Sequence, residues 1–236
     1  MRKRPEGADL FEVGTNRSWK SFFHDVDSGS VEALDMLGFT SIYPAGAILY
    51  AAGQASRGIF LVCRGSAKLC ISSADGRTLI TKIAKPGQVL GLSSSLAGNL
   101  YKATAETLEP SQVNFVRRED LIHFLSVHHS ACATVIRHLA NECEADADHI
   151  RAIELSRTAS EKLATLILSW CVPGRDDEPC RLQMLLTHEH VSQLIGTSRE
   201  TVTRLFKQFR DRNLISIKGA TLTVIDRAGL RAIAVA

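Results

Sequence analysis

Short apolar runs separated by glycines occupy residues 39–116 of this 236-residue chain. Arg64-Gly65 and Asp75-Gly76 lie between runs in the manner of hairpin turns, and Pro86-Gly87 interrupts another run. Short strands at this spacing predict an antiparallel barrel or sandwich of about seven or eight strands. The clearest predicted strands cover residues 47–50, 59–63, 67–72, 79–83 and 112–116.

A helical pattern follows from residue 119 to about residue 156, and its long second part, from residue 130, contains neither Pro nor Gly. Apolar positions there recur in alternating steps of three and four, which predicts a narrow stripe that pairs with the same helix of a second copy. Packing against the predicted barrel is the alternative. Asp146 interrupts the stripe and can fix its register at a cost in stability. The stripe consists of Ile136, Leu139, Cys143, Asp146, Ile150 and Ile153.

The last third of the chain reads as several short elements. Helices are predicted at 160–171, 187–195 and 198–213, a strand at 181–186, and a two-stranded wing at 215–217 and 222–225. Gly196 suits a tight turn with positive φ between the second and third of these helices, and the small Ser192 suits close backbone approach there.

Together these patterns predict an α+β fold with an antiparallel barrel or sandwich, a long dimerisation helix and a helix-turn-helix with a wing. A further short helix is expected at residues 30–37. The predicted segments are a flexible polar arm at 1–18, the barrel or sandwich at 19–126, the dimerisation helix at 127–156 and the winged domain at 157–236.

The positive charge is concentrated in one place. Residues 187–218 hold six Lys or Arg and three Asp or Glu, which accounts for the net charge of +3 of the whole chain. A local basic patch indicates a polyanionic partner, although a solvated helix face has the same composition.

The predicted helix at 198–213 exposes a set of side chains suited to reading DNA. Arg199 and Arg204 can each bind guanine bidentately, and Glu200 can accept from the cytosine amino group. Residues at the start of a recognition helix reach base edges in the major groove. Thr187 and His188 begin the preceding helix and are placed to contact phosphate. The full set of candidate DNA contacts is Thr187, His188, Ser198, Arg199, Glu200, Thr201, Thr203, Arg204 and Lys207.

The segment Thr-Ser-Arg-Glu-Thr-Val-Thr-Arg-Leu at 197–205, followed by Asn-Leu-Ile-Ser from 213, resembles the helix-turn-helix of the bacterial Crp/Fnr transcription regulators. Residues 44–53 and 58–69 are similar to the cyclic-nucleotide-binding-type β-roll of that family. The resemblance implies that residues 19–126 form a jelly-roll-like antiparallel β-roll, which would sense an effector, and that residues 157–236 form a winged helix-turn-helix. The resemblance implies a homodimer that binds a pseudo-palindrome with TGTGA-like half-sites, with RNA polymerase as a further partner. It also implies that the residues matching Arg199, Glu200 and Arg204 read base edges.

The effector pocket departs from the family's cAMP-binding pattern. Leu92 stands where that pattern has a glutamate for the ribose, and Tyr101 stands where it has an arginine for the cyclic phosphate. Lys102 is at most a point charge, without the bidentate fork of arginine. Asp146 replaces an expected hydroxyl and would repel phosphate. These departures predict that cAMP does not bind. The candidate pocket residues are Gly91, Leu92, Ser93, Tyr101, Lys102 and Asp146.

The effector itself stays open. The cysteines lack the clustering of an iron–sulfur site, so such a cluster is not expected. Cys63 and Cys70 could face each other across Arg64-Gly65 as a redox pair, or serve as core thiols. His128, His129 or His138 could ligate haem, or they could be ordinary surface or helix-end histidines. We expect a signal in the β-roll to shift the dimerisation helix and its junction at residues 156–160.

Other function classes lack support in the sequence. No zinc-type spacing of Cys and His and no catalytic motif is present, so no metal site and no enzyme are expected. No apolar run approaches the roughly 18–20 residues of a membrane span, and no secretory signal follows the charged start. A cytoplasmic location is therefore expected. The alternatives are an effector-independent DNA binder with a vestigial pocket, or a sensing module that controls a protein partner.

Overall fold

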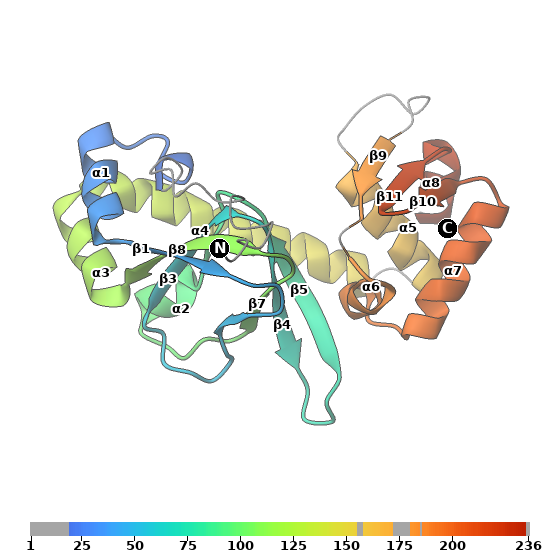
Figure 1. The fold of residues 1–236 in the computed structure, drawn as a ribbon, viewed down its shortest axis with the longest axis horizontal. Coiled ribbons are helices and arrows are strands. Elements are labelled where there is room, and N and C mark those ends of the chain that lie inside the picture. The colour runs from blue at the N-terminus through green and yellow to red at the C-terminus, as the bar shows by residue number, and fades with distance from the viewer. Residues whose placement is uncertain (1–18, 155–157, 172–179, 185, 235–236) are drawn as a thin grey trace, which may run out of the picture.

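The computed structural model describes residues 19–154, 158–171, 180–184 and 186–234. A β-roll with its covering helices forms one lobe and a small helical lobe with a three-stranded sheet forms the other, while the long helix α4 (His129–Glu154) extends from the first toward the second (Figure 1). The predicted arm at 1–18 and residues 156–157 of the predicted junction lie outside the described residues.

Two four-stranded antiparallel sheets make up the β-roll. One has the strand order β1-β8-β3-β6 and the other β2-β7-β4-β5, which confirms the predicted antiparallel β-roll. Aromatic and aliphatic side chains such as Tyr50, Phe60 and Val113 fill the space between the sheets. The strands are β1 (Phe39–Tyr43), β2 (Ile48–Tyr50), β3 (Gly58–Arg64), β4 (Ala67–Ser72), β5 (Thr78–Ala84), β6 (Val89–Leu90), β7 (Thr104–Thr107) and β8 (Ser111–Arg117).

One predicted hairpin is wrong. Asp75-Gly76 joins the paired strands β4 and β5 as expected, but Arg64-Gly65 carries the chain from one sheet to the other. Gly65 has a φ of +78°, and a Cβ there would lie 2.3 Å from Ser111 Oγ, so only glycine fits this crossing. Cys63 and Cys70 therefore lie on different sheets, both buried, and they do not face each other across a hairpin. Burial raises the pKa of both thiols.

Helices cover one end of the roll (Figure 1). They are the 3-10 turn η1 (Trp19–Ser21), α1 (Ser28–Leu37), α2 (Leu92–Ala97) and α3 (Arg118–Val127), followed by α4. α1 starts two residues before its predicted beginning, where Asp27 accepts a hydrogen bond from the amide of Ser30 at 2.9 Å. Trp19, Phe23 and Leu34 pack with the outer face of the roll in one fully buried cluster.

The second lobe contains a helix-turn-helix and a sheet. Its elements are α5 (Ala159–Trp170), β9 (Cys180–Gln183), α6 (His188–Ile195), α7 (Arg199–Asp211), β10 (Ile215–Lys218), β11 (Thr221–Val224) and α8 (Arg227–Ala234). The sheet has the order β10-β11-β9, so the predicted two-stranded wing has a third strand, and α8 was not predicted. Ile80 of β5 is fully buried in the core of this lobe, which docks the lobe on the roll.

Among the described residues, no helix is long and apolar enough to cross a membrane.

Candidate nucleic-acid interface and effector cavity

The helix-turn-helix is held by caps at the start of both helices. Thr187 Oγ1 accepts from the amide of His190 at 3.2 Å, and Ser198 Oγ accepts from the amide of Thr201 at 3.2 Å. Gly196 between them has a φ of +64°, as the tight turn requires. The apolar sides of both helices are buried in the lobe's core, so the opposite side of α7 faces outward.

We call the exposed side of α7 the recognition face. It consists of Arg199, Glu200, Thr203, Arg204 and Lys207, all of them exposed. They border a shallow hollow of about 610 Å³ that His188 and Arg210 also line. No hydrogen bond or ion pair joins the guanidinium groups of Arg199 and Arg204 or the ammonium of Lys207 to another residue in the described part of the chain. These cations are therefore available to an external anion.

Glu200 stays ionised within this basic surface. Its own backbone amide, the Ser198 hydroxyl and the charge of Arg199 all lower the pKa of its carboxyl group. An ionised carboxylate between two arginines accepts hydrogen bonds only, which matches an amino group on a base edge rather than a phosphate.

His188 links the two helices rather than standing free. Its Nδ1 lies 2.9 Å from Thr203 Oγ1, and its ring stacks on Phe206 with centroids 5.0 Å apart. Thr203 Oγ1 donates a hydrogen bond to the carbonyl of Arg199 at 3.0 Å. In the contact between His188 and Thr203 the donor is therefore the Nδ1–H of His188. Burial, with help from Arg199 and Arg210, lowers the pKa of His188. The Nε2 of a neutral ring that donates through Nδ1 can only accept, so the phosphate contact predicted for His188 would use the backbone amide at the start of α6, and it stays a prediction.

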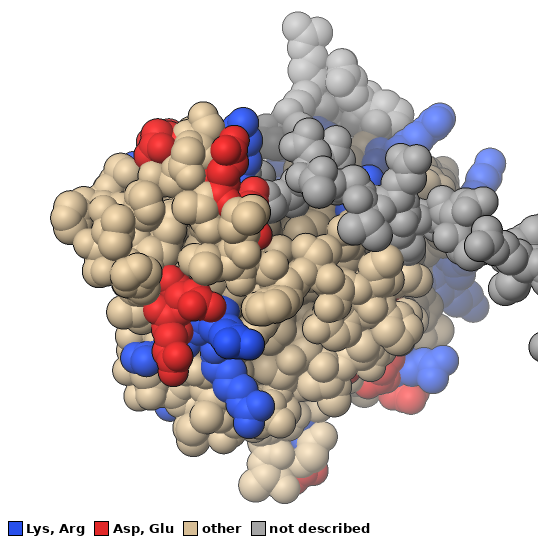
Figure 2. Space-filling model, turned by 60° about the vertical axis from the view of Figure 1, so that its left-hand side comes forward, with Lys and Arg blue, Asp and Glu red and all other residues tan. Residues whose placement is uncertain are grey.

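Several basic side chains of the β-roll form ion pairs with carboxylates of the protein. On the face in Figure 2, which brings the β-roll end forward, blue basic groups lie beside red acidic ones and most of the surface is uncharged. Asp25 pairs with Arg137, and Glu142 with Lys82. Arg57, Arg64 and Lys102 of the roll also lack an ion pair with a described residue, so the recognition face is distinguished by the clustering of its unpaired cations.

A cavity of about 500 Å³ lies between the roll and α4, and we call it the effector cavity. All six predicted pocket residues line it: Gly91, Leu92, Ser93, Tyr101, Lys102 and Asp146. Sequence reasoning missed the other walls, which come from Tyr50, from Leu69 and Ile71 of β4, from Leu79, Thr81 and Lys82 of β5, and from Glu142 and Ile150 of α4. Strand pairing and the packing of α4 against the roll bring these distant segments to one place.

Two polar side chains of the effector cavity, Tyr101 and Lys82, are already engaged, whereas Lys102 is exposed and has no ion pair with another described residue. Tyr101 is 4% exposed, its hydroxyl donates to the carbonyl of Gly58 at 2.6 Å, and its ring stacks on Tyr50. Lys82 forms an ion pair with Glu142. Burial opposes ionisation of Glu142, but the neighbouring His138, 3.6 Å away, and the hydrogen-bonded Lys82 lower its pKa to about 2. The spacing of His138 and Glu142, one helical turn apart, was the one sequence signal that could have found this cluster.

The charged groups that line the cavity differ from the arginine-based pattern of a cAMP site. No arginine is among the described lining residues, its inward lysine is neutralised, and Asp146 and Glu142 add negative charge. The three candidate haem ligands do not line the cavity either. His128 is hydrogen-bonded to Ser30 at 2.7 Å, and His138 packs on Phe22 beside Glu142, while His129 is exposed. No group of three or more metal-ligating side chains occurs within the described ranges.

The predicted stripe on α4 is mostly uncovered in the single chain. Ile136 is 66% and Ile150 61% exposed, and Cys143 and Asp146 are also exposed. Leu139 is half-buried against the core under the N-terminal helices. The side chain of Ile153 lies outside the described residues. An apolar stripe left open along a helix is suited to a partner helix.

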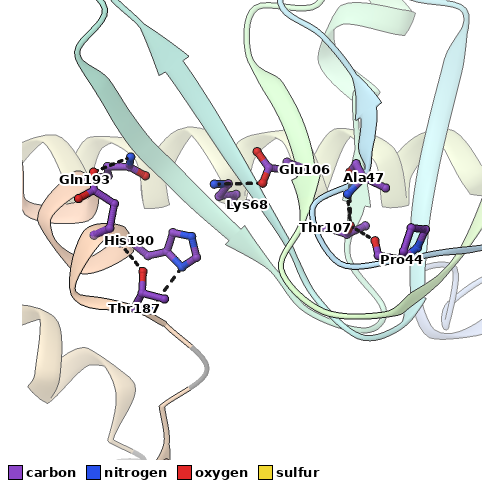
Figure 3. A network of polar contacts seen from close by, with 9 residues as sticks. Pro44, Ala47, Lys68, Glu106, Thr107, Thr187, His190 and Gln193 are labelled. Atoms are coloured by element: carbon purple, nitrogen blue, oxygen red, sulfur yellow. Dashed lines mark hydrogen bonds and ion pairs between the residues drawn. The ribbon is translucent and has the colours of Figure 1, made fainter. Parts of the chain in front are cut away.

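One strand connects the cavity to the helix-turn-helix. Leu79 and Thr81 of β5 line the cavity, whereas Ile80 between them points into the core of the second lobe. Figure 3 shows α6 beside the strands that carry Lys68 and Glu106, an ion pair with 3.3 Å between Nζ and Oε1. Burial and the nearby Lys68 lower the pKa of His190 on α6.

Two family models match the chain: the cyclic nucleotide-binding domain at residues 41–128 and the Crp-like helix-turn-helix domain at 161–233. Among curated proteins, the cAMP-activated global transcriptional regulator CRP of Pasteurella multocida is 22% identical over 77% of this chain and 88% of its own. The fumarate and nitrate reduction regulatory protein of Vibrio cholerae is 25% identical over 79% and 74%. The structure of FixK2 from Bradyrhizobium japonicum shares the fold with a TM-score of 0.72, at 21% identity over 83% of this chain and 96% of FixK2.

Proposed function

Because this chain belongs to the Crp/Fnr family of DNA-binding transcription regulators, we propose that it binds a pseudo-palindromic operator as a homodimer. Each copy would insert α7 into the major groove, at TGTGA-like half-sites about 34 Å apart. The observation that carries the proposal is the recognition face, where Arg199 and Arg204 flank the ionised Glu200 without partners of their own. RNA polymerase would be the further partner at a promoter.

The effector in this proposal is not a cyclic nucleotide. The neutralised Lys82, the paired Tyr101 and the carboxylate of Asp146 support that exclusion, because each removes or opposes a phosphate contact. An occupant of the effector cavity would instead bias the position of β5 and α4, and so of the second lobe that packs on β5. The effector stays unassigned, and iron–sulfur chemistry is not invoked.

Base reading can be tested by fluorescence anisotropy with a TGTGA palindrome and a scrambled duplex at one fixed salt concentration. Arg199→Ala or Arg204→Ala is expected to cost about 1–3 kcal/mol on the palindrome and to relax base preference at one position. The reason is that each guanidinium can satisfy two acceptors of one guanine. Thermal unfolding should be unchanged, because both side chains are exposed.

Lys207→Ala is the matched control on the same face. As a phosphate contact it should weaken both duplexes alike and reduce the slope of log affinity against log salt by about one. If Arg199→Ala and Arg204→Ala also weaken both duplexes equally, base reading by these residues is refuted.

The homodimer can be tested by sedimentation of an Ile136→Asp variant. A carboxylate on each copy of a buried stripe would be desolvated without a partner, so the dissociation constant should rise at least about a hundredfold. Ile136 suits the test because it does not line the effector cavity. Met36→Asp is the control, since Met36 is 86% exposed on α1 and lies away from the stripe. Equal association of the two variants would exclude the α4 stripe as the interface.

A further inference from the structure

A second cavity of about 580 Å³ opens into the β-roll and is separate from the effector cavity. The two cavities share only Tyr50 and Tyr101, whose rings stack 4.0 Å apart and form a common wall. We call the second one the aromatic cavity, because six of the chain's 14 aromatic residues line it, including all three tyrosines. These residues are Phe39, Tyr43, Tyr50, Phe60, Tyr101 and Phe115.

The rings form a continuous surface from the shared wall to the cavity mouth. Tyr50 lies 5.4 Å from Phe60, and Phe60 lies 4.8 Å from Phe115, measured between ring centroids. Phe39 on the edge strand β1 is 55% exposed. Most large apolar side chains of the roll are buried, so an exposed ring beside a lined cavity marks a surface suited to contact with another flat apolar group.

The charged groups at the mouth of the aromatic cavity are positive. Arg57 is the only charged residue among the described lining residues, it is exposed, and no ion pair joins it to another described residue. The guanidinium of Arg117 lies 5.4 Å from the centroid of the Phe39 ring and adds a second positive group nearby. Gln54 and Ser41 supply neutral polar groups. An anion at the mouth would meet no lining carboxylate.

We infer that the aromatic cavity is a binding site for a small planar aromatic carboxylate. The ring system would pack against Phe39 and Phe115, and the carboxylate would pair with the guanidinium of Arg57. The volume lies within the range of small-molecule sites and accommodates two fused rings. A cationic ligand would be repelled by Arg57, and a purely apolar one would leave that charge unpaired. The inference does not depend on DNA binding or on the occupant of the effector cavity.

Calorimetric titration of the full chain with 2-naphthoate tests the site. We expect saturable binding that Arg57→Gln weakens at least about tenfold and Phe39→Ala weakens several-fold. Arg64→Gln is the matched control, because Arg64 is an exposed arginine at the end of β3 that does not line the cavity. The neutral 2-naphthamide should bind about tenfold more weakly than the carboxylate. Both substituted side chains are exposed, so the variants should unfold at the wild-type temperature.

The same titration distinguishes this site from the effector cavity. Lys102→Gln removes the exposed cation of the effector cavity and should leave 2-naphthoate binding unchanged. Loss of binding in Lys102→Gln with full binding in Arg57→Gln would place the ligand in the effector cavity and overturn the inference. Absence of binding at millimolar ligand, or equal binding of the carboxylate and the amide, would overturn it as well.

Discussion

The recognition face leaves all its basic side chains open to solvent, whereas one of the two lysines that line the effector cavity is neutralised within the protein. On α7, Arg199 and Arg204 project from exposed positions without a described partner. In the cavity, Lys82 is joined to Glu142, and this hydrogen bond and the neighbouring His138 hold the pKa of Glu142 at about 2 despite its burial. Cations left open suit a polyanion that approaches from outside, whereas a cation neutralised within the protein does not select an anionic ligand.

This difference explains why the family's DNA-contacting residues can be assigned to positions of this chain, whereas its effector-binding residues cannot. A DNA duplex presents the same phosphates and base edges to every regulator, so the residues that meet it have little freedom to change. A sensing cavity can exchange ligands by a few substitutions while the surrounding strands stay in place. Leu92 and Tyr101 lie where the cAMP-binding pattern needs charged groups, and both are buried within an intact roll.

The largest effect that would sharpen this comparison is expected from Glu142→Gln. Removing the carboxylate leaves Lys82 and His138 without their partner, and should lower the free energy of unfolding at pH 7 by about 1–3 kcal/mol. Because the folded-state pKa of Glu142 is lowered to about 2 from 4.5, its contribution is complete above pH 4.5 and is lost as the pH falls toward 2. Urea unfolding at pH 7 and pH 3.5 measures both values.

Glu144→Gln is the control for this prediction, since Glu144 is an exposed glutamate on the same helix. It should change the free energy of unfolding by no more than a few tenths of a kcal/mol at either pH. If the difference in free energy of unfolding between wild type and Glu142→Gln stays constant from pH 7 to pH 3.5, the ion pair does not stabilise the fold. The contrast between neutralised and open cations would then lose its energetic basis.

Local signals made the helix-turn-helix predictable from the sequence. Gly196 supplies the positive φ of the turn, and Ser198 caps α7 through an amide three residues away, so each feature depends on a few neighbouring residues. The pocket residues near positions 91 and 101 were found through the family pattern. Their contact with the wall residues Lys82 and Glu142 depends on sheet pairing and on the docking of α4, which periodicity does not report.

The wrong hairpin at Gly65 and the unpredicted pairing of the third wing strand have the same physical origin. The turn at Gly65 has the composition of a hairpin, but in a two-layer roll it passes the chain between sheets, and this separates Cys63 from Cys70. The third strand of the wing sheet forms because Leu182 of β9 pairs with Leu222 of β11, which lies 40 positions away in the sequence. Such pairings are set by tertiary packing and leave no local signature.

A smaller effect, at the recognition face, is expected from Ser198→Ala. Loss of the capping oxygen leaves an unsatisfied amide at Thr201 and should cost about 1 kcal/mol of stability, independent of pH between 5 and 8. The first turn of α7 carries Arg199 and Glu200, so its fraying should also weaken palindrome binding several-fold. Urea unfolding and anisotropy measure the two effects.

Ser198→Asn tests the cause of that loss, because asparagine keeps an oxygen able to cap the helix. It should restore both the stability and the affinity that Ser198→Ala removes. If asparagine restores stability but not affinity, the Ser198 hydroxyl itself contacts DNA, as the list of candidate contacts predicts. If it restores neither, the start of α7 is held by the packing of Val202 and Phe206 in the core rather than by its cap. The recognition face would then be positioned by the buried side of α7.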